Sequence, residues 1–144
     1  MSFKSNACSC AGSESIKEAY SESDIVFIGT VVSIKKVKAN SDSLVNALGI
    51  FYQNEVTVAT NTSFKGTPSS LQTIITGIGH GDCGFRFQEG EQYIIYATSK
   101  GVYSEIKQSN FQTNICDRTN TIDELSEDIA QLNELANRTP QKLK

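Results

Sequence analysis

Four cysteines are the residues of this chain best suited to covalent chemistry: Cys8, Cys10, Cys83 and Cys116. Cys8 and Cys10 are separated by a single residue, and a bond between them would distort disulfide geometry. We therefore expect each to pair with a distant cysteine, which leaves Cys8–Cys83 with Cys10–Cys116, or Cys8–Cys116 with Cys10–Cys83. Either arrangement closes loops of roughly 75 to 110 residues, worth about 4 kcal/mol per bridge. Cys8-Ser9-Cys10, which we call the N-terminal strip, is thus tied to distant parts of the fold.

The alternatives to disulfides are a zinc site, reduced structural cysteines and a nucleophilic Cys–His pair. Four-cysteine zinc sites usually contain two close pairs, often with C-x-x-C spacing, whereas Cys8 and Cys10 are the only close pair here. His80 is the only histidine and precedes Cys83 in a glycine-rich loop, but a disulfide at Cys83 excludes a Cys–His nucleophile. No other constellation suits acid–base or phosphate chemistry. We therefore predict that the chain is not an enzyme and has no catalytic residue, no cofactor and no intrinsic metal.

Composition indicates a small globular domain. The 144 residues fit one domain with one core, and the hydrophobic fraction is 38%. The net charge of −3 argues against nucleic acid as a partner, because a phosphate backbone requires clustered basic residues. The nearest such cluster is Lys35, Lys36 and Lys38, which is typical of a solvated strand edge. No apolar run is long enough to span a membrane. We expect a monomer.

The two ends of the chain suggest the domain boundaries. Residues 1–7 lack the apolar core of a signal peptide, yet Ser5-Asn6-Ala7 has the small residues that a signal peptidase recognises. We interpret 1–7 as a processed leader or a cloning remnant, 8–137 as a single domain and 138–144 as a frayed tail. Paired cysteines favour a protein that is secreted or lies on the extracellular face of the cell envelope.

Helices are predicted at both ends of the domain. Residues 13–23 form a short helix, because Ser15 and Glu18 make a capping-box pattern. Residues 122–136 form a longer helix, with a second capping-box pattern that begins at Thr121. An apolar stripe predicts that this helix buries one face: Ile122, Leu125, Ile129, Leu132 and Leu135.

Between the helices the sequence predicts short strands. Residues 25–37 are rich in β-branched side chains, and Gly29 within them indicates a bulge or a bend. Val56 and Val58 share a face of the second strand, and a glycine-rich loop occupies residues 77–84. The strands after the first are 52–64, 71–76, 92–98, 102–106 and 111–115. This pattern predicts a mainly β fold, a small closed or nearly closed barrel flanked by helices.

Five motifs occur in the order and spacing of one known family. Cys8-Ser9-Cys10 precedes the first helix, the first strand begins with SDIVFIGTV at residues 23–31, and Phe64-Lys65-Gly66 closes a later strand. The other two are Asp82-Cys83-Gly84 followed by Phe87, Gly90, Tyr93, Ile94 and Tyr96, and Cys116 followed by Arg118. Together these motifs resemble the netrin-like domain of the tissue inhibitors of metalloproteinases, over nearly the whole chain.

The resemblance implies a fold and selects a disulfide pairing. The implied fold is a five-stranded, closed OB-type barrel with a short N-terminal helix and a packed C-terminal helix. The implied pairing is Cys8–Cys83 with Cys10–Cys116. Both would fix the N-terminal strip across the rim of the barrel.

The resemblance also implies a partner and a binding edge. In the inhibitors, the α-amino group and the carbonyl of the first cysteine chelate the zinc ion of the target protease, as the ligand preferences of zinc allow. Carried over, Cys8 is the chelator, Ser9 enters the specificity pocket and Cys10 completes the strip. Gly81-Asp82-Cys83 forms the neighbouring part of the edge. The implied partner is a protein, a zinc metalloproteinase.

The sequence departs from the inhibitors in ways that affect function. Their third bridge joins the first helix to the last, but the matching helix here reads Ala19-Tyr20-Ser21 and has no cysteine. Residues precede Cys8 in this numbering, and a blocked amine cannot chelate zinc, so inhibition requires processing that exposes Cys8. The two-disulfide form looks like that of a bacterial relative. The alternative function is a non-inhibitory protein-interaction domain, extracellular or in the cell envelope.

Overall fold

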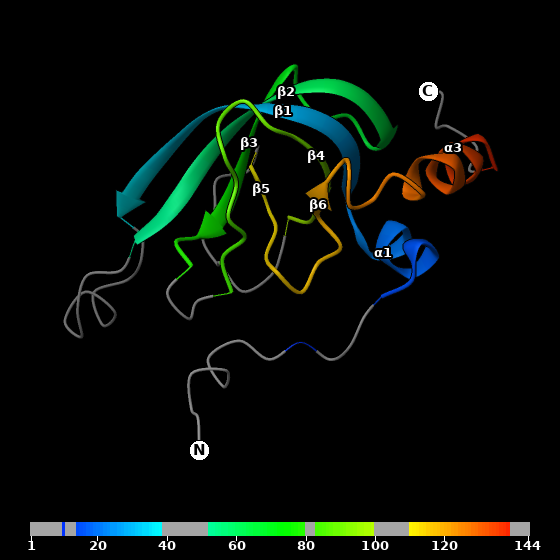
Figure 1. Ribbon diagram of the computed structural model, residues 1–144, viewed down its shortest axis with the longest axis horizontal. Coiled ribbons are helices and arrows are strands. Elements are labelled where there is room, and N and C mark those ends of the chain that lie inside the picture. The colour runs from blue at the N-terminus through cyan, green and yellow to red at the C-terminus, as the bar shows by residue number, and fades with distance from the viewer. Residues whose placement is uncertain (1–9, 11–13, 39–51, 80–82, 100–109, 139–144) are drawn as a thin grey trace.

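The chain forms a mainly β domain with helices on one side of a curled sheet (Figure 1). The computed structural model describes residues 10, 14–38, 52–79, 83–99 and 110–138. Their sheet has six strands in the order β5-β3-β2-β1-β4-β6, and it curls into a half barrel. Helices α1 and α3 lie next to each other against this sheet.

The helices and strands follow the sequence pattern closely for most of the chain. Their bounds are α1 Ile16–Glu22, β1 Ile25–Lys38, β2 Tyr52–Lys65, β3 Leu71–Gly77, β4 Gln92–Ala97, β5 Phe111–Gln112, β6 Asn120–Thr121 and α3 Asp128–Arg138. The capping box of α1 is confirmed, with Ser15 and Glu18 each accepting from the other's backbone N–H. The strand predicted at 111–115 is reduced to β5, and the one predicted at 102–106 lies outside the described residues.

The first part of β1 and most of β4 are buried on both faces of the sheet, because their side chains alternate between two apolar clusters. Val26 and Ile28 of β1 face the helices, where they join Tyr20 of α1 and Leu132 of α3. Phe27 belongs to the inward face of the curled sheet. The other buried members of that inner cluster are Ile25, Val31, Val56, Val58, Ile74, Phe87, Tyr93, Ile95 and Ala97. Val56 and Val58 therefore share a face, as predicted.

Gly29 is the position at which β1 bends. The ladder between β1 and β2 shifts register between Ile28 and Gly29, which confirms the predicted irregularity. A Cβ atom at Gly29 would collide with the side chain of Val58 and lie 3.0 Å from the carbonyl oxygen of Ala59. Glycine is required here because the neighbouring strand comes too close for any side chain.

The predicted closed, five-stranded barrel is not confirmed, because the sheet is open and has six strands. Within the described residues, the two sides of the curled sheet are joined by one isolated β-bridge. There Gln112 of β5 exchanges backbone hydrogen bonds with Thr98, which follows β4, at 3.0 and 2.8 Å. Beyond that bridge, hydroxyl groups replace the ladder: Thr119 Oγ1 accepts from the Tyr96 N–H at 2.9 Å, and Thr113 Oγ1 donates to the Tyr96 carbonyl at 2.9 Å. The chain turns away after β5, so a continuous ladder does not form.

The C-terminal helix begins at Asp128, so its predicted start at Ile122 is wrong. Thr121 Oγ1 accepts a hydrogen bond from the Glu124 N–H at 3.2 Å, as a cap would. The segment that follows is a series of turns, and the Asp128 N–H bonds to the Leu125 carbonyl at 2.8 Å, which is tighter than α-helical spacing. The apolar stripe is nevertheless buried as predicted, through Leu125 and Leu132 and the partly buried residues between and around them.

We predict that Gly29→Ala destabilises the domain by about 2 kcal/mol or more, because the added methyl group forces β1 and β2 apart. Urea denaturation of both proteins measures the change. Val32→Ala is the matched control in the same strand, because Val32 is 52% exposed and its truncation should cost less than about 1 kcal/mol. Equal losses for the two variants would contradict this account of the bend.

Candidate functional site

The N-terminal strip is covalently joined to the connection between β5 and β6. Cys10 and Cys116 form a disulfide with a Cα–Cα distance of 5.2 Å across a sequence separation of 106. This is the pairing that the resemblance implies for these two residues. A zinc site formed by all four cysteines is therefore wrong, and no group of three or more metal-binding side chains occurs within the described residues.

Cys83 lies beside the segment that carries Cys116. Its carbonyl accepts a hydrogen bond from the Ile115 N–H at 2.9 Å, and its thiol group is also in a disulfide. A thiol consumed in this way cannot act as a nucleophile, so the Cys–His pair is wrong. The structure thus brings Cys10, Cys83 and Cys116 to one edge of the sheet. The other predicted edge residues, and His80, lie outside the described residues: Cys8, Ser9, Gly81 and Asp82.

The turn at Cys83 is fixed to the end of β3. Cys83 has a positive φ of 64°, a conformation that L-residues other than Asn and Asp rarely adopt. The next residue must be glycine, since a Cβ atom at Gly84 would collide with the Gly77 carbonyl group. The Phe85 N–H then donates to Thr76 Oγ1 at 2.9 Å. These contacts explain why the Asp82-Cys83-Gly84 motif has glycine at its last position.

Two hollows flank Ile115 at this edge. One has a volume of about 530 Å³ and is lined by Cys10, Glu14 and Cys116 among others. The second, of about 1010 Å³, opens toward the aromatic side chains of the inner cluster. Ile115 and Phe85 line both, and Ile115 is 50% exposed. An exposed apolar side chain beside disulfide-fixed backbone suits contact with a protein surface.

The smaller hollow carries an unusual carboxyl group. The pKa of Glu14 is raised from 4.5 to about 7, first by burial and then by a hydrogen bond to the Glu22 carboxyl. Burial also raises the pKa of Asp117, against the lowering effect of the hydrogen bonds it accepts from Asn114 and Thr113. The negative charges that raise the Glu14 pKa further belong to Glu22, Asp117 and Glu18. This side of the edge therefore changes its charge near neutral pH.

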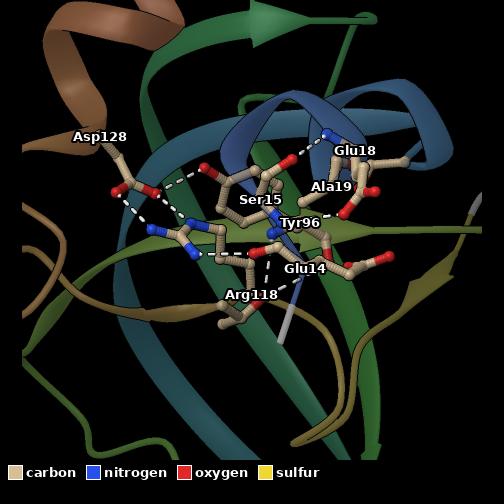
Figure 2. A network of polar contacts seen from close by, with 9 residues as sticks. Glu14, Ser15, Glu18, Ala19, Tyr96, Arg118 and Asp128 are labelled. Carbon is tan, nitrogen blue, oxygen red and sulfur yellow. Dashed lines mark hydrogen bonds and ion pairs between the residues drawn. The ribbon is translucent and has the colours of Figure 1, made fainter. Parts of the chain in front are cut away.

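Arg118 anchors a network that sequence reasoning missed (Figure 2). Its Nε and Nη2 donate to the two carboxylate oxygens of Asp128 at 2.7 and 3.0 Å, and its Nη1 donates to the Glu14 carbonyl at 3.0 Å. The Tyr96 hydroxyl donates to Asp128 at 2.8 Å. The hydrogen bonds from Arg118 to Asp128 raise the pKa of the guanidinium further. The signal that could have revealed it is Asp128 itself, a carboxylate on the apolar stripe between Leu125 and Leu132 that needs a buried partner.

The disulfide at Cys10 holds the N-terminal strip as the netrin-like resemblance implies, although the sheet is an open half barrel and not the closed barrel of that expectation. Comparison with protein families matches residues 6–137 to the tissue inhibitor of metalloproteinase family. The chain belongs to that family. No curated protein matches the chain significantly. No helix in the described part of the chain has the length and hydropathy needed to cross a membrane.

We predict that replacing both Cys10 and Cys116 with serine destabilises the domain by about 4–5 kcal/mol, because the bond closes a very long loop. Urea denaturation under non-reducing conditions measures the difference. The wild-type protein with dithiothreitol is the companion measurement, and its loss should be at least as large, because reduction opens every bridge. A loss below about 1 kcal/mol for the double variant would show that the strip is held by other contacts.

We also predict that stability falls as pH rises from about 5 to about 8. The unfolded Glu14 carboxyl titrates at its ordinary pKa of 4.5, whereas in the fold the pKa is about 7. The folded state therefore retains the proton in this window, and its stabilising effect is lost as the pH passes the folded pKa.

Differential scanning calorimetry of wild type and Glu14→Gln tests this pH dependence. Glutamine does not ionise, so the variant should show a smaller drop in Tm between pH 5 and 8. The difference should be on the order of 3 °C, after allowing for solvent screening at this partly exposed position. Glu127→Gln, at an exposed position of the turns before α3, is the matched control. Parallel pH profiles for wild type and Glu14→Gln would exclude Glu14 as the group responsible.

Proposed function

We propose that this protein is a secreted inhibitor of zinc metalloproteinases that binds its target through the edge beside the Cys10–Cys116 disulfide. The observation that carries the proposal is the family match over residues 6–137. The disulfide supports it, because it fixes Cys10 beside the backbone of Cys83 and Ile115. Disulfides persist in oxidising compartments, which supports secretion.

The proposed mechanism is chelation by the first cysteine. Once Cys8 is the terminal residue, its neutral α-amino group and its carbonyl oxygen provide two ligands for the open position of a catalytic zinc ion. The water that attacks the substrate is then displaced, and the protease is inactive. Ser9 would enter the specificity pocket, and Gly81-Asp82-Cys83 would contact the rim of the protease cleft. Ile115 extends this edge with an exposed apolar side chain.

Preorganisation is the reason that a fixed strip favours tight binding. A flexible peptide loses conformational freedom when it enters a protease cleft, and this loss weakens its affinity. Here the disulfide at Cys10 and the hydrogen bond between Ile115 and Cys83 restrict the backbone before binding. A separate proposal concerns origin. Because α1 has no cysteine, the chain lacks the inhibitors' third bridge, and we propose from this two-disulfide form that it is a bacterial relative of the family.

The test compares two preparations that differ by one residue. The first begins at Cys8, and the second carries an additional alanine before Cys8, which removes the free amine from the cysteine. We expect the first to inhibit purified catalytic domains of zinc metalloproteinases at least about 100-fold more strongly than the second. A 100-fold change corresponds to only about 2.7 kcal/mol, and the second preparation loses a metal ligand. The inhibition constant against a fluorogenic peptide is the measurement.

Other outcomes contradict parts of the proposal. Equal inhibition by both preparations would exclude chelation through the Cys8 amine while leaving inhibition itself intact. No inhibition by either preparation, with the disulfides verified by mass, would exclude protease inhibition. The chain would then be a non-inhibitory protein-interaction domain of the extracellular space or cell envelope.

A further inference from the structure

We propose that Arg118 is a positioning residue that sets the direction in which the N-terminal strip leaves the domain; the inference rests on the proposed function of that strip. Arg118 lines the same hollow as Cys10, one of the predicted binding residues. It acts through the backbone of Glu14, which connects the strip to α1. Figure 2 shows its side chain between Asp128 of α3 and the Glu14–Ser15 segment.

Each nitrogen of the Arg118 guanidinium donates a hydrogen bond. Nε and Nη2 form a bidentate pair with Asp128, whose side chain is only 2% exposed. The buried carboxylate is fixed further by the Tyr96 hydroxyl. The remaining nitrogen, Nη1, is thereby directed at the Glu14 carbonyl, 3.0 Å away. Because a planar guanidinium has a rigid fork of donors, fixing one side of the fork fixes the other.

Glu14 is a second point at which the N-terminal segment is held to the rest of the fold. This segment is held at Cys10 by its disulfide to Cys116 and at Glu14 by its hydrogen bond to Arg118. Both partners, Cys116 and Arg118, belong to the same connection between β5 and β6. Directly after Glu14, Ser15 caps α1, whose apolar face packs into the core. The hydrogen bond from Arg118 thus fixes the backbone of Glu14 between the disulfide at Cys10 and the cap of α1.

A purely stabilising role is the competing explanation, because buried ion pairs do not reliably indicate function. The two explanations predict different effects of a substitution at Arg118, either on local opening of the folded protein or only on its Tm. A positioning role predicts local loosening at Cys10 and Ser15 under conditions where the domain stays folded. A stabilising role predicts only a lower Tm and leaves local opening of the folded state unchanged.

The test compares Arg118→Lys with Ile129→Ala in the intact protein. Lysine keeps a positive charge for Asp128 but lacks the fork that reaches Glu14. Ile129 is a partly buried residue of α3 next to Asp128 and outside the network, so its truncation lowers stability without changing any contact to the strip. Arg118→Gln is a second substitution that keeps a planar donor and removes the charge.

Two measurements on the folded proteins read out positioning without any protease. These are amide hydrogen exchange at Ser15 and Glu18, and the rate at which dithiothreitol reduces the Cys10–Cys116 bond. We expect Arg118→Lys to accelerate both by about tenfold, as for loss of one charge-assisted hydrogen bond. Ile129→Ala should leave both unchanged. Equal rates in wild type and Arg118→Lys, or equal acceleration in Ile129→Ala at matched Tm, would overturn the proposal.

The inhibition constant then links positioning to function. In the preparation that begins at Cys8, Arg118→Lys should weaken inhibition about tenfold through faster dissociation, and Ile129→Ala should not. Unchanged inhibition despite faster exchange would overturn the claim that Arg118 positions the strip for its partner. If wild type inhibits nothing, the proposed function fails, and faster exchange in Arg118→Lys still supports Arg118 as the residue that orients the strip.

Discussion

The Cys10–Cys116 disulfide is the constraint on which the proposed binding edge depends. It joins points separated by 106 residues, so it fixes the beginning of the domain against the end of its sheet. Ile115, next to Cys116, holds the backbone of Cys83 through a hydrogen bond. The edge is therefore an assembly of three chain segments that are distant in sequence. Its geometry is only as well defined as the connection between β5 and β6, to which the other two segments are attached.

The connection between β5 and β6 is held more by side-chain hydrogen bonds than by backbone pairing between strands. β5 is only two residues long, yet it pairs with β3 on one side and meets Thr98 at a bridge on the other. The hydroxyls of Thr113 and Thr119 then satisfy the backbone of Tyr96, where a longer strand would have done so. These bonds are buried, and a buried backbone group without a partner would be costly. An incomplete barrel can thus support a precise edge.

Local sequence patterns correctly predicted the helices and strands that neighbouring residues specify. They failed where contacts between distant residues determine the bounds of an element. The capping box at Ser15 and the β-branched run around Gly29 specify α1 and β1 from neighbouring residues alone. The start of α3 is different, because the Asp128 side chain is held by Arg118 and Tyr96, which are distant in sequence. Closure of the barrel likewise depends on where β5 ends. For the site, the cysteine spacing excluded one pairing and left two possible, and the structure shows the bond between Cys10 and Cys116.

The Arg118 network has a consequence for how the protein acquires its bridges. In the related inhibitors a cysteine pair links the first and last helices. Here Arg118 connects the residue before α1 to the start of α3 through an ion pair with Asp128 and a hydrogen bond to Glu14, and these contacts need no oxidant. These contacts join the segments that precede and begin the two helices without a covalent bond between them. The hydrogen bond holds Glu14 beside Arg118, which raises the effective concentration of the Cys10 thiol near Cys116. This contact therefore favours the Cys10–Cys116 bond over the other pairings open to these four cysteines.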